Sequence, residues 1–145
     1  MLLGSYETRI TDKNRIAIPK KLRIELGENL ILSRGYEGCI LLLDGDRWNN
    51  LLNIITKDPI LNVSVRNTLR FIIAGAHEVV LDKQGRLVLP QSLIEYAGID
   101  DTVEILGMKD WIEIWDKNVW IKLLGDISKS ADDIAEKLIK NNVKT

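Results

Sequence analysis

The amino-acid sequence predicts an α+β fold made of two tandem repeats that complete one another within one chain. The first observation is a phrase that occurs twice: residues 12–23 read DKNRIAIPKKLR, and residues 83–94 read KQGRLVLPQSLI. The second is that short strand-like segments alternate with short helix-like segments in each copy. The third is length, because 145 residues suit one domain, whereas half of this chain would bury too little surface to fold alone.

The repeat extends well beyond this phrase. Aligning Arg15 with Arg86 also aligns Gly27 with Gly98, and Trp48 with Trp120 after a small length change. Two copies are fewer than a solenoid needs, so we expect the copies to share a core. The predicted divisions are a first repeat over residues 5–49, a connecting helical segment over 50–75, a second repeat over 76–120 and a helical tail over 121–145.

Each copy is predicted to begin with a β-hairpin. Residues that favour a pleated surface give the strands Tyr6–Thr11 and Arg15–Ile18 in the first copy, and Val79–Leu81 and Arg86–Leu89 in the second. The turns fall at residues 13–14 and 84–85, where asparagine and glycine tolerate a positive φ.

A stub helix and a second hairpin follow in each copy. Pro19 and Pro90 suit the first turn of a helix, and Gly27 and Gly98 are typical helix ends. The next predicted strands are Asn29–Arg34 and Cys39–Leu43 in the first copy, and Thr102–Leu106 and Trp111–Trp115 in the second. The helices predicted to close the copies are Asp46–Ile55 and Asp116–Leu124.

Two further helices are predicted outside the repeated pattern. Ser64 suits the N-cap of a connecting helix between the copies. Ser130 with Asp133 forms a capping-box pattern, followed by Ile134 and Leu138 on one face. A helix of about ten residues is marginal in isolation, so we expect the tail to dock on the body or on a neighbouring molecule.

The chain lacks the residue patterns of common enzymes. His77 is the only histidine and Cys39 the only cysteine, and no CxxC, HExxH or P-loop pattern occurs. We therefore expect no enzymatic activity, no metal site, no cofactor and no small-molecule substrate. The longest apolar runs, such as Ile40–Leu43, are far shorter than the ~20 residues of a membrane span, and MLLGSYETRI does not resemble a secretory signal. A cytoplasmic protein is expected.

Charge is distributed unevenly along the chain. The net charge is −1, yet residues 1–27 carry a surplus of three positive charges and residues 99–145 a surplus of three negative charges. Such asymmetry is typical of a surface for a polyanion, but it equally fits an ordinary solvated face.

The second turn carries the most specific chemistry. Asp82 precedes Arg86 by four residues across a hairpin, a spacing that can hold the guanidinium in a fixed direction. An oriented arginine suits guanine O6 and N7 or a phosphate, and Lys83 adds affinity for phosphate. The alternative is an ordinary salt-bridged hairpin without a ligand.

The segments YETRITDKNRIAIPKKLR, DKQGRLVLP and IEIWDKNVW resemble the MraZ family of bacterial transcriptional regulators, within the AbrB-like swapped-hairpin group. The resemblance implies two swapped-hairpin β-barrel repeats that pair within one chain, and a ring-shaped homo-oligomer. It also implies that a DxxxR motif in each half contacts double-stranded DNA in the nucleoid. The implied targets are repeated boxes upstream of the division and cell wall gene cluster, including the regulator's own gene.

Carried over residue by residue, the DxxxR motif falls on Asp82 and Arg86 in the second half. In the first half Arg15 matches, but Thr11 stands at the acid position and Asn14 where the family usually has glycine. Thr11 can hydrogen-bond Arg15 but cannot pair its charge. The residues expected to contribute to DNA binding are Arg9, Thr11, Lys13, Arg15, Lys20, Asp82, Lys83 and Arg86.

A second hypothesis is a swapped-hairpin protein-interaction module, antitoxin-like or an adaptor ring, that binds no nucleic acid. An antitoxin usually carries a disordered tail that wraps its toxin. Residues 100–145 instead read as strands and helices, which favours the DNA-binding hypothesis.

Overall fold

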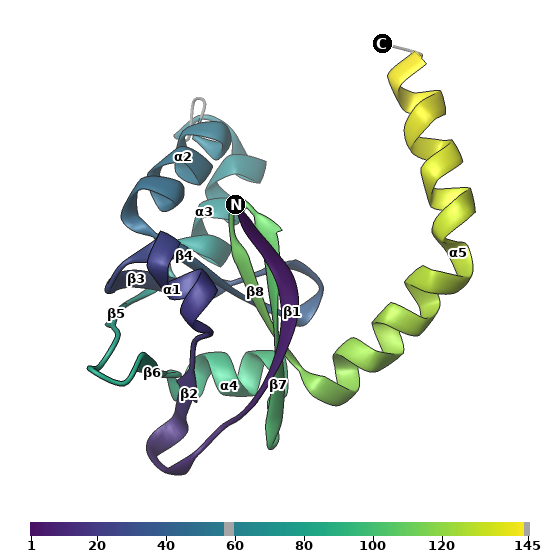
Figure 1. The fold of residues 1–145 in the computed structure, drawn as a ribbon. Coiled ribbons are helices and arrows are strands. Elements are labelled where there is room, and N and C mark those ends of the chain that lie inside the picture. Colours follow the sequence, from purple (N-terminus) through teal and green to yellow (C-terminus); the bar gives the residue numbers. More distant parts are fainter. Residues whose placement is uncertain (57–59, 144–145) are drawn as a thin grey trace.

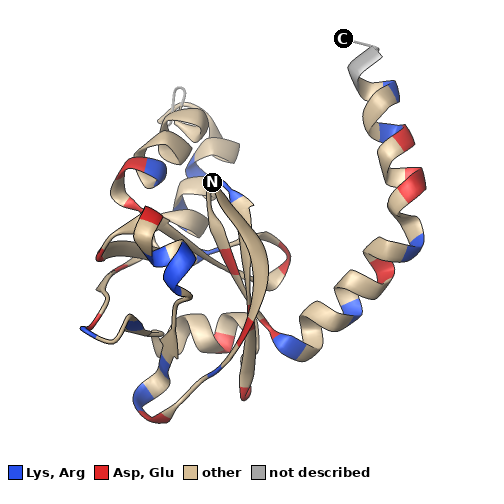
Figure 2. Cartoon of the chain, viewed as in Figure 1, with Lys and Arg blue, Asp and Glu red and all other residues tan. Residues whose placement is uncertain are grey.

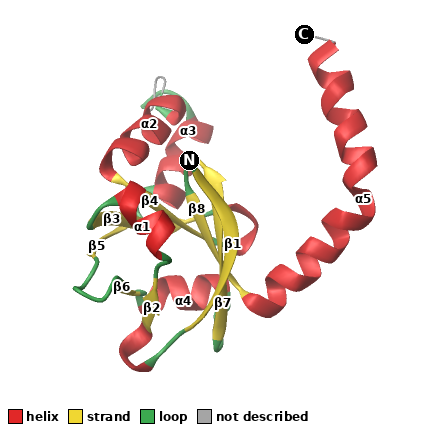
Figure 3. Cartoon of the chain, viewed as in Figure 1, coloured by secondary structure: helices red, strands yellow, loops and turns green. Residues whose placement is uncertain are grey.

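The structure is a computed structural model that describes residues 1–56 and 60–143. It confirms the predicted α+β class (Figure 3). The strands are β1 (Leu2–Arg9), β2 (Arg15–Ala17), β3 (Asn29–Arg34), β4 (Ile40–Asp44), β5 (His77–Val80), β6 (Arg86–Val88), β7 (Thr102–Lys109) and β8 (Ile112–Asp116). The α-helices are α1 (Lys20–Leu26), α2 (Gly45–Ile55), α3 (Val63–Ile72), α4 (Gln91–Ala97) and α5 (Lys117–Val143). Residues 57–59 of the predicted connecting segment and 144–145 of the predicted tail lie outside the described residues.

The strands of the two repeats exchange partners. Six strands form one antiparallel sheet in the order β1-β7-β8-β4-β3-β5, so that β1 of the first repeat lies beside β7 of the second, and β5 of the second beside β3 of the first (Figure 1). The strands β2 and β6 pair separately as a two-stranded antiparallel ribbon. The strands β1, β2 and β5 therefore pair only with strands of the other repeat.

The exchange also explains why two strand boundaries were predicted wrongly. β1 begins at Leu2 rather than at Tyr6, because Leu2 through Arg9 pair continuously with Lys109 through Thr102 of β7. Similarly, β5 covers His77–Val80 rather than residues 79–81, because it pairs with β3. Each partner strand belongs to the other repeat, so local sequence does not indicate where pairing begins.

The stub helices position the ribbon over the core. Leu22 of α1 and Leu93 of α4 are both 2% exposed and share an apolar cluster with Ile16 and Leu87 of the ribbon. The helices end at Gly27 and Gly98, as predicted, with φ of 79° and 62°, in the region that favours glycine.

The helix starts differ slightly from the prediction. Pro19 and Pro90 are the N-caps rather than the first helical residues, because their ψ angles of 139° and 141° are still extended. The N-cap of α3 is Asn62 instead of Ser64: its side-chain oxygen accepts hydrogen bonds from the backbone N–H groups of Ser64 and Val65 at 2.9 and 3.2 Å. Ser64 thus lies inside the helix whose N-cap it was predicted to be.

The C-terminal helix α5 is one helix of 27 residues, so the prediction of two separate helices is wrong. The carboxylate of Asp116 accepts hydrogen bonds from the backbone N–H groups of Asn118 and Val119 at its start. Gly125 and Ser130 are weaker helix formers than alanine, but neither ends the helix. Beyond the first two turns α5 stands away from the body (Figure 1). Within the described residues, no helix has the combined length and apolar character needed to cross a membrane.

Candidate nucleic-acid interface

The ribbon places one arginine from each repeat on the same outward face. Its register sets Arg15 opposite Val88 and Ala17 opposite Arg86. Side chains alternate between the faces of a strand, so these four point outward, while Ile16 and Leu87 between them are each 1% exposed in the core. The Cα atoms of diagonal neighbours in such a pair are about 7–8 Å apart. The fold therefore brings together two arginines that are 71 positions apart in the sequence.

In the second turn (residues 82–86), the carboxylate of Asp82 fixes Arg86. One carboxylate oxygen accepts from the backbone N–H groups of Gln84 and Arg86, each at 2.9 Å, and the other accepts from Nε of Arg86, also at 2.9 Å. The hydrogen bond from the Arg86 backbone is the largest cause that lowers the pKa of Asp82 below its ordinary value, and the guanidinium lowers it further. The contact uses Nε, and among the described residues no hydrogen bond engages the two terminal nitrogens of Arg86.

The first turn (residues 11–15) closes in the same way, but it lacks the bond between a carboxylate and the arginine side chain, which we call the clamp. The backbone N–H of Thr11 donates to the carbonyl of Arg15 at 2.9 Å, as Asp82 does to Arg86. The Thr11 hydroxyl donates to that same carbonyl at 3.2 Å, not to the guanidinium. Among the described residues, no ion pair joins Arg15 to an acid. Arg15 is therefore held less firmly than Arg86.

The backbones of the two turns also differ. Lys13 and Asn14 both have left-handed backbones, with φ of 64° and 58°, whereas the second turn has positive φ only at Gly85, at 76°. Asn14, at the position of that glycine, tolerates this conformation because its side chain can hydrogen-bond locally. It also donates to the side chain of Gln91 at 3.4 Å.

Each turn is hydrogen-bonded to the other repeat. The N–H of Ile18 donates to the carbonyl of Gly85 at 2.9 Å, and the N–H of Leu89 donates to the carbonyl of Asn14 at 2.8 Å. These bonds continue the ribbon past both its ends. The positions of the two arginines are therefore set jointly by both halves of the chain.

Basic side chains gather around this ribbon. Figure 2 shows Lys and Arg residues at both turns and along α1. Residues 11–23 and 82–86 together hold seven cations against two acids, in a chain whose net charge is −1. The predicted residues Lys13, Lys20 and Lys83 are exposed there. Arg9 instead forms an exposed ion pair at 3.1 Å with Asp101, which directs its guanidinium toward β7.

Sequence reasoning missed Arg23 as part of the site. Its Nε donates to the carbonyl of Ile18 at 2.8 Å, and a Cβ added to Gly85 would clash with its guanidinium. The guanidinium of the first repeat thus lies directly against the second turn. In the sequence, only the glycine at position 85 indicates this contact, and it does not show which side chain lies against it.

Comparison with known proteins agrees with the two-repeat organisation. The family model described as "MraZ protein, putative antitoxin-like" matches twice, over residues 1–71 and 72–142. A solved structure, the solution structure of PHS018 from Pyrococcus horikoshii, covers 79% of this chain and 88% of its own at 16% identity, but its TM-score of 0.32 is too low to support a comparison of folds.

Several curated relatives carry the name transcriptional regulator MraZ. The one from Acetivibrio thermocellus is 41% identical and the one from Caldicellulosiruptor bescii 42% identical, each over 138 residues, or 95% of this chain and 96% of theirs. The one from Clostridium acetobutylicum is 45% identical over 103 residues, or 71% of this chain and 72% of its own. With one family model matching both halves and relatives at this identity, the chain belongs to the MraZ family.

Proposed function

We propose that this protein is a sequence-specific DNA-binding transcriptional regulator that reads DNA with the outward face of the ribbon. The observation that carries the proposal is the register that places Arg15 and Arg86 on one face, flanked by the basic turns. A two-stranded ribbon fits the major groove of B-DNA. The names of the curated relatives support a role in transcription.

The diagonal placement of the two arginines is compatible with contacts to bases two steps apart. A diagonal of about 7–8 Å across the ribbon corresponds to about two base-pair steps of 3.4 Å. Arg86, fixed through its Nε, offers its terminal nitrogens to O6 and N7 of a guanine. Lys13, Lys20 and Lys83 surround these arginines and would contact phosphates, which position the protein without reading sequence.

Assembly supplies the affinity that a single ribbon lacks. A few phosphate contacts give weak binding at physiological salt, whereas several ribbons bound to neighbouring boxes gain from effective concentration. We therefore propose a homo-oligomeric ring of AbrB-like swapped-hairpin subunits in the nucleoid, an assignment supported by the exchanged strands. Its targets would be repeated boxes upstream of its own gene and of the division and cell wall gene cluster.

The test is binding of the purified protein to the DNA upstream of its own gene, measured by fluorescence anisotropy against a scrambled duplex. Arg86→Ala is expected to lower the affinity for the upstream DNA about 5- to 150-fold, the range for losing one bidentate base contact. The free energy of unfolding should change by no more than about 0.5 kcal/mol, as for most surface substitutions. Lys122→Ala, on the exposed face of α5, is the control and should bind like the wild type.

Two outcomes would contradict the proposal. Unchanged affinity of Arg86→Ala would exclude the ribbon as the reading element. Equal binding of the upstream and scrambled duplexes by the wild type would exclude sequence-specific recognition and favour the protein-interaction alternative.

A further inference from the structure

The outer part of α5 has an apolar stripe that packs against none of the described residues of its own chain. Every residue from 124 to 141 is exposed. Ile127, Ala131, Ile134 and Leu138 follow one another at spacings of four, three and four residues, which places them on one face of a helix. We call these four residues the stripe. Helices gain most of their stability in proteins from packing such a face, so this one lacks the contact that would hold it.

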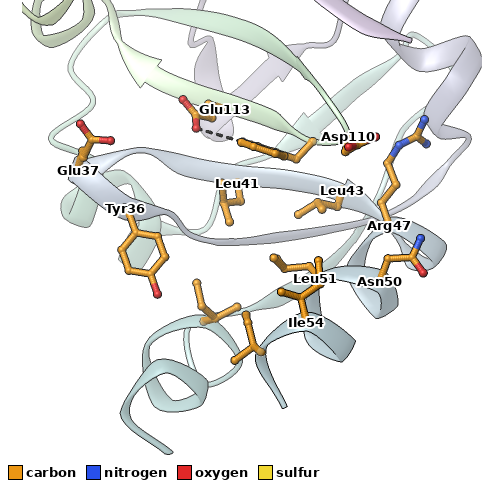
Figure 4. A pocket seen from close by; sticks show the side chains of 13 residues that line it. Tyr36, Glu37, Leu41, Leu43, Arg47, Asn50, Leu51, Ile54, Asp110 and Glu113 are labelled. Atoms are coloured by element: carbon orange, nitrogen blue, oxygen red, sulfur yellow. Dashed lines mark hydrogen bonds between the residues drawn. The ribbon is translucent and has the colours of Figure 1, made fainter. Parts of the chain in front are cut away.

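The body of the same chain carries an apolar groove of about 540 Å³. It lies between α2 and the strands β4 and β8 (Figure 4). Its apolar lining includes Leu41, Leu43, Leu51, Ile54, Ile72 and Trp111. Ile54 is 77% exposed although the groove also contains Leu51 and Ile72, so the groove is open to solvent at α2. Burying such a surface against another apolar surface would be favourable.

The stripe and the groove of one chain do not meet each other. α5 starts over β7 and β8, where its first turns join the apolar cluster that α2 and α3 also pack against, and its outer part then runs away from the body (Figure 1). Because the exposed stripe of one chain does not reach the groove of that chain, the two surfaces can cover one another only between copies. Contacts of this head-to-tail kind repeat from copy to copy and close into a ring when the rotation allows it.

The charges beside the two surfaces are complementary. Glu37, Asp110 and Glu113 line the groove, and among the described residues none of them forms an ion pair. Trp111 and Trp115 donate to the Glu113 carboxylate, which keeps that acid ordered at the rim. Lys137 is the charged residue nearest the stripe on the helical wheel and is also without an acidic partner in the described part of the chain.

We propose that the stripe of α5 docks into the groove of a second copy of this chain. Each copy would then donate one helix and receive one, with Ile134 and Leu138 in the groove and Lys137 beside its acidic rim. This inference rests on the homo-oligomer of the proposed function and identifies the surfaces that form it. Pairing of two stripes as a coiled coil is the competing arrangement, but the stripe spans fewer than the three heptads that such pairing usually needs.

Disulfide trapping tests which surfaces meet. The native Cys39 is 1% exposed, and burial raises its pKa to about 12, so it does not compete for oxidation. Ile54→Cys and Leu138→Cys are made in separate chains and oxidised alone or as a mixture. The mixture is expected to give dimers linked between positions 54 and 138, whereas Leu138→Cys alone gives none. Dimers of Leu138→Cys alone, or no dimers in the mixture, would overturn the proposal.

The mass of the assembly in solution provides a second measurement. Leu138→Glu should reduce the mass measured by light scattering to that of a monomer, while Lys140→Glu, which places the same side chain on the polar face, should leave it unchanged. A wild-type monomer, or a wild-type mass for Leu138→Glu, would overturn the docking. Affinity for a duplex with a single box, measured in parallel, should not change in Leu138→Glu, so failure of the assembly and failure of DNA reading are distinguishable.

Discussion

Replacing Asp82 with asparagine separates two effects of this carboxylate on DNA binding. The carboxylate repels DNA, but it also holds Arg86 in place. In Asp82→Asn the side-chain oxygen can still accept from the N–H groups of Gln84 and Arg86, so the turn should keep its shape. The amide nitrogen would face Nε of Arg86 in place of an oxygen, and the 2.9 Å charge-assisted bond would be lost.

The expected result is weaker binding despite the loss of a negative charge. A free arginine must give up side-chain freedom when it binds, which lowers affinity about 2- to 10-fold for one long side chain. Because hydrogen bonds hold the pKa of Asp82 below its usual value, the comparison at neutral pH is between a charged carboxylate and a neutral amide. The measurement is the affinity for a single box at two salt concentrations, with circular dichroism as a check on folding.

The salt dependence distinguishes the two effects. The loss of affinity caused by a less ordered Arg86 should be the same at both salt concentrations, since it involves no long-range charge. The gain in affinity from removing the repulsion should fade as the salt concentration rises. Tighter binding of Asp82→Asn at low salt, disappearing at high salt, would show that repulsion dominates and that the clamp contributes little.

Two further predictions concern stability. Fragments 1–72 and 73–145 should each fail to give a cooperative thermal melt and should regain structure only when mixed, because separating them removes the partners of β1, β2 and β5; a cooperative melt of either fragment as a monomer would contradict this. Gly85→Ala should lower the melting temperature by roughly 4–8 °C, since a left-handed backbone costs a residue with a Cβ about 1–2 kcal/mol and the new Cβ displaces Arg23. Gly125→Ala, in open space on α5, should instead raise the melting temperature. A similar fall in melting temperature in both variants would show that the strain at Gly85 is not the cause.

The elements within each repeat could be predicted because their signals are local. The glycines that end the stub helices and the paired residues of the turns act over a few neighbouring positions, and the structure has them where the sequence placed them. The exchange of strands has no such signal. Pairing of Leu2 with Lys109 depends on a core to which both halves contribute, so the start of β1 was predicted four residues late.

The tail shows the opposite error, in which a local signal was overvalued. Ser130 and Asp133 have the spacing of a capping box, but that spacing is equally allowed inside a helix. Helix propagation adds one hydrogen bond for each residue fixed, whereas a new start requires another nucleation step, so continuation through Ser130 is favoured. Arg23 was overlooked for a different reason: its contact with Gly85 joins the two repeats, and nothing near residue 23 indicates it.

Thr11→Asp is the reciprocal test of the clamp, in the repeat that lacks it. The first turn already closes through the same backbone bond, from Thr11 N–H to the Arg15 carbonyl at 2.9 Å, so a carboxylate at position 11 starts from the position that Asp82 has in the second turn. The hydroxyl bond of 3.2 Å to that carbonyl is lost, but it does not orient the guanidinium. We expect Thr11→Asp to order Arg15 and to tighten binding to a single box about 2- to 10-fold, although it adds a negative charge beside DNA. Thr11→Asn, which is similar in shape but uncharged, should bind like the wild type. Weaker binding of Thr11→Asp at low salt that recovers at high salt would refute the ordering argument, because only repulsion by the new charge is screened in that way.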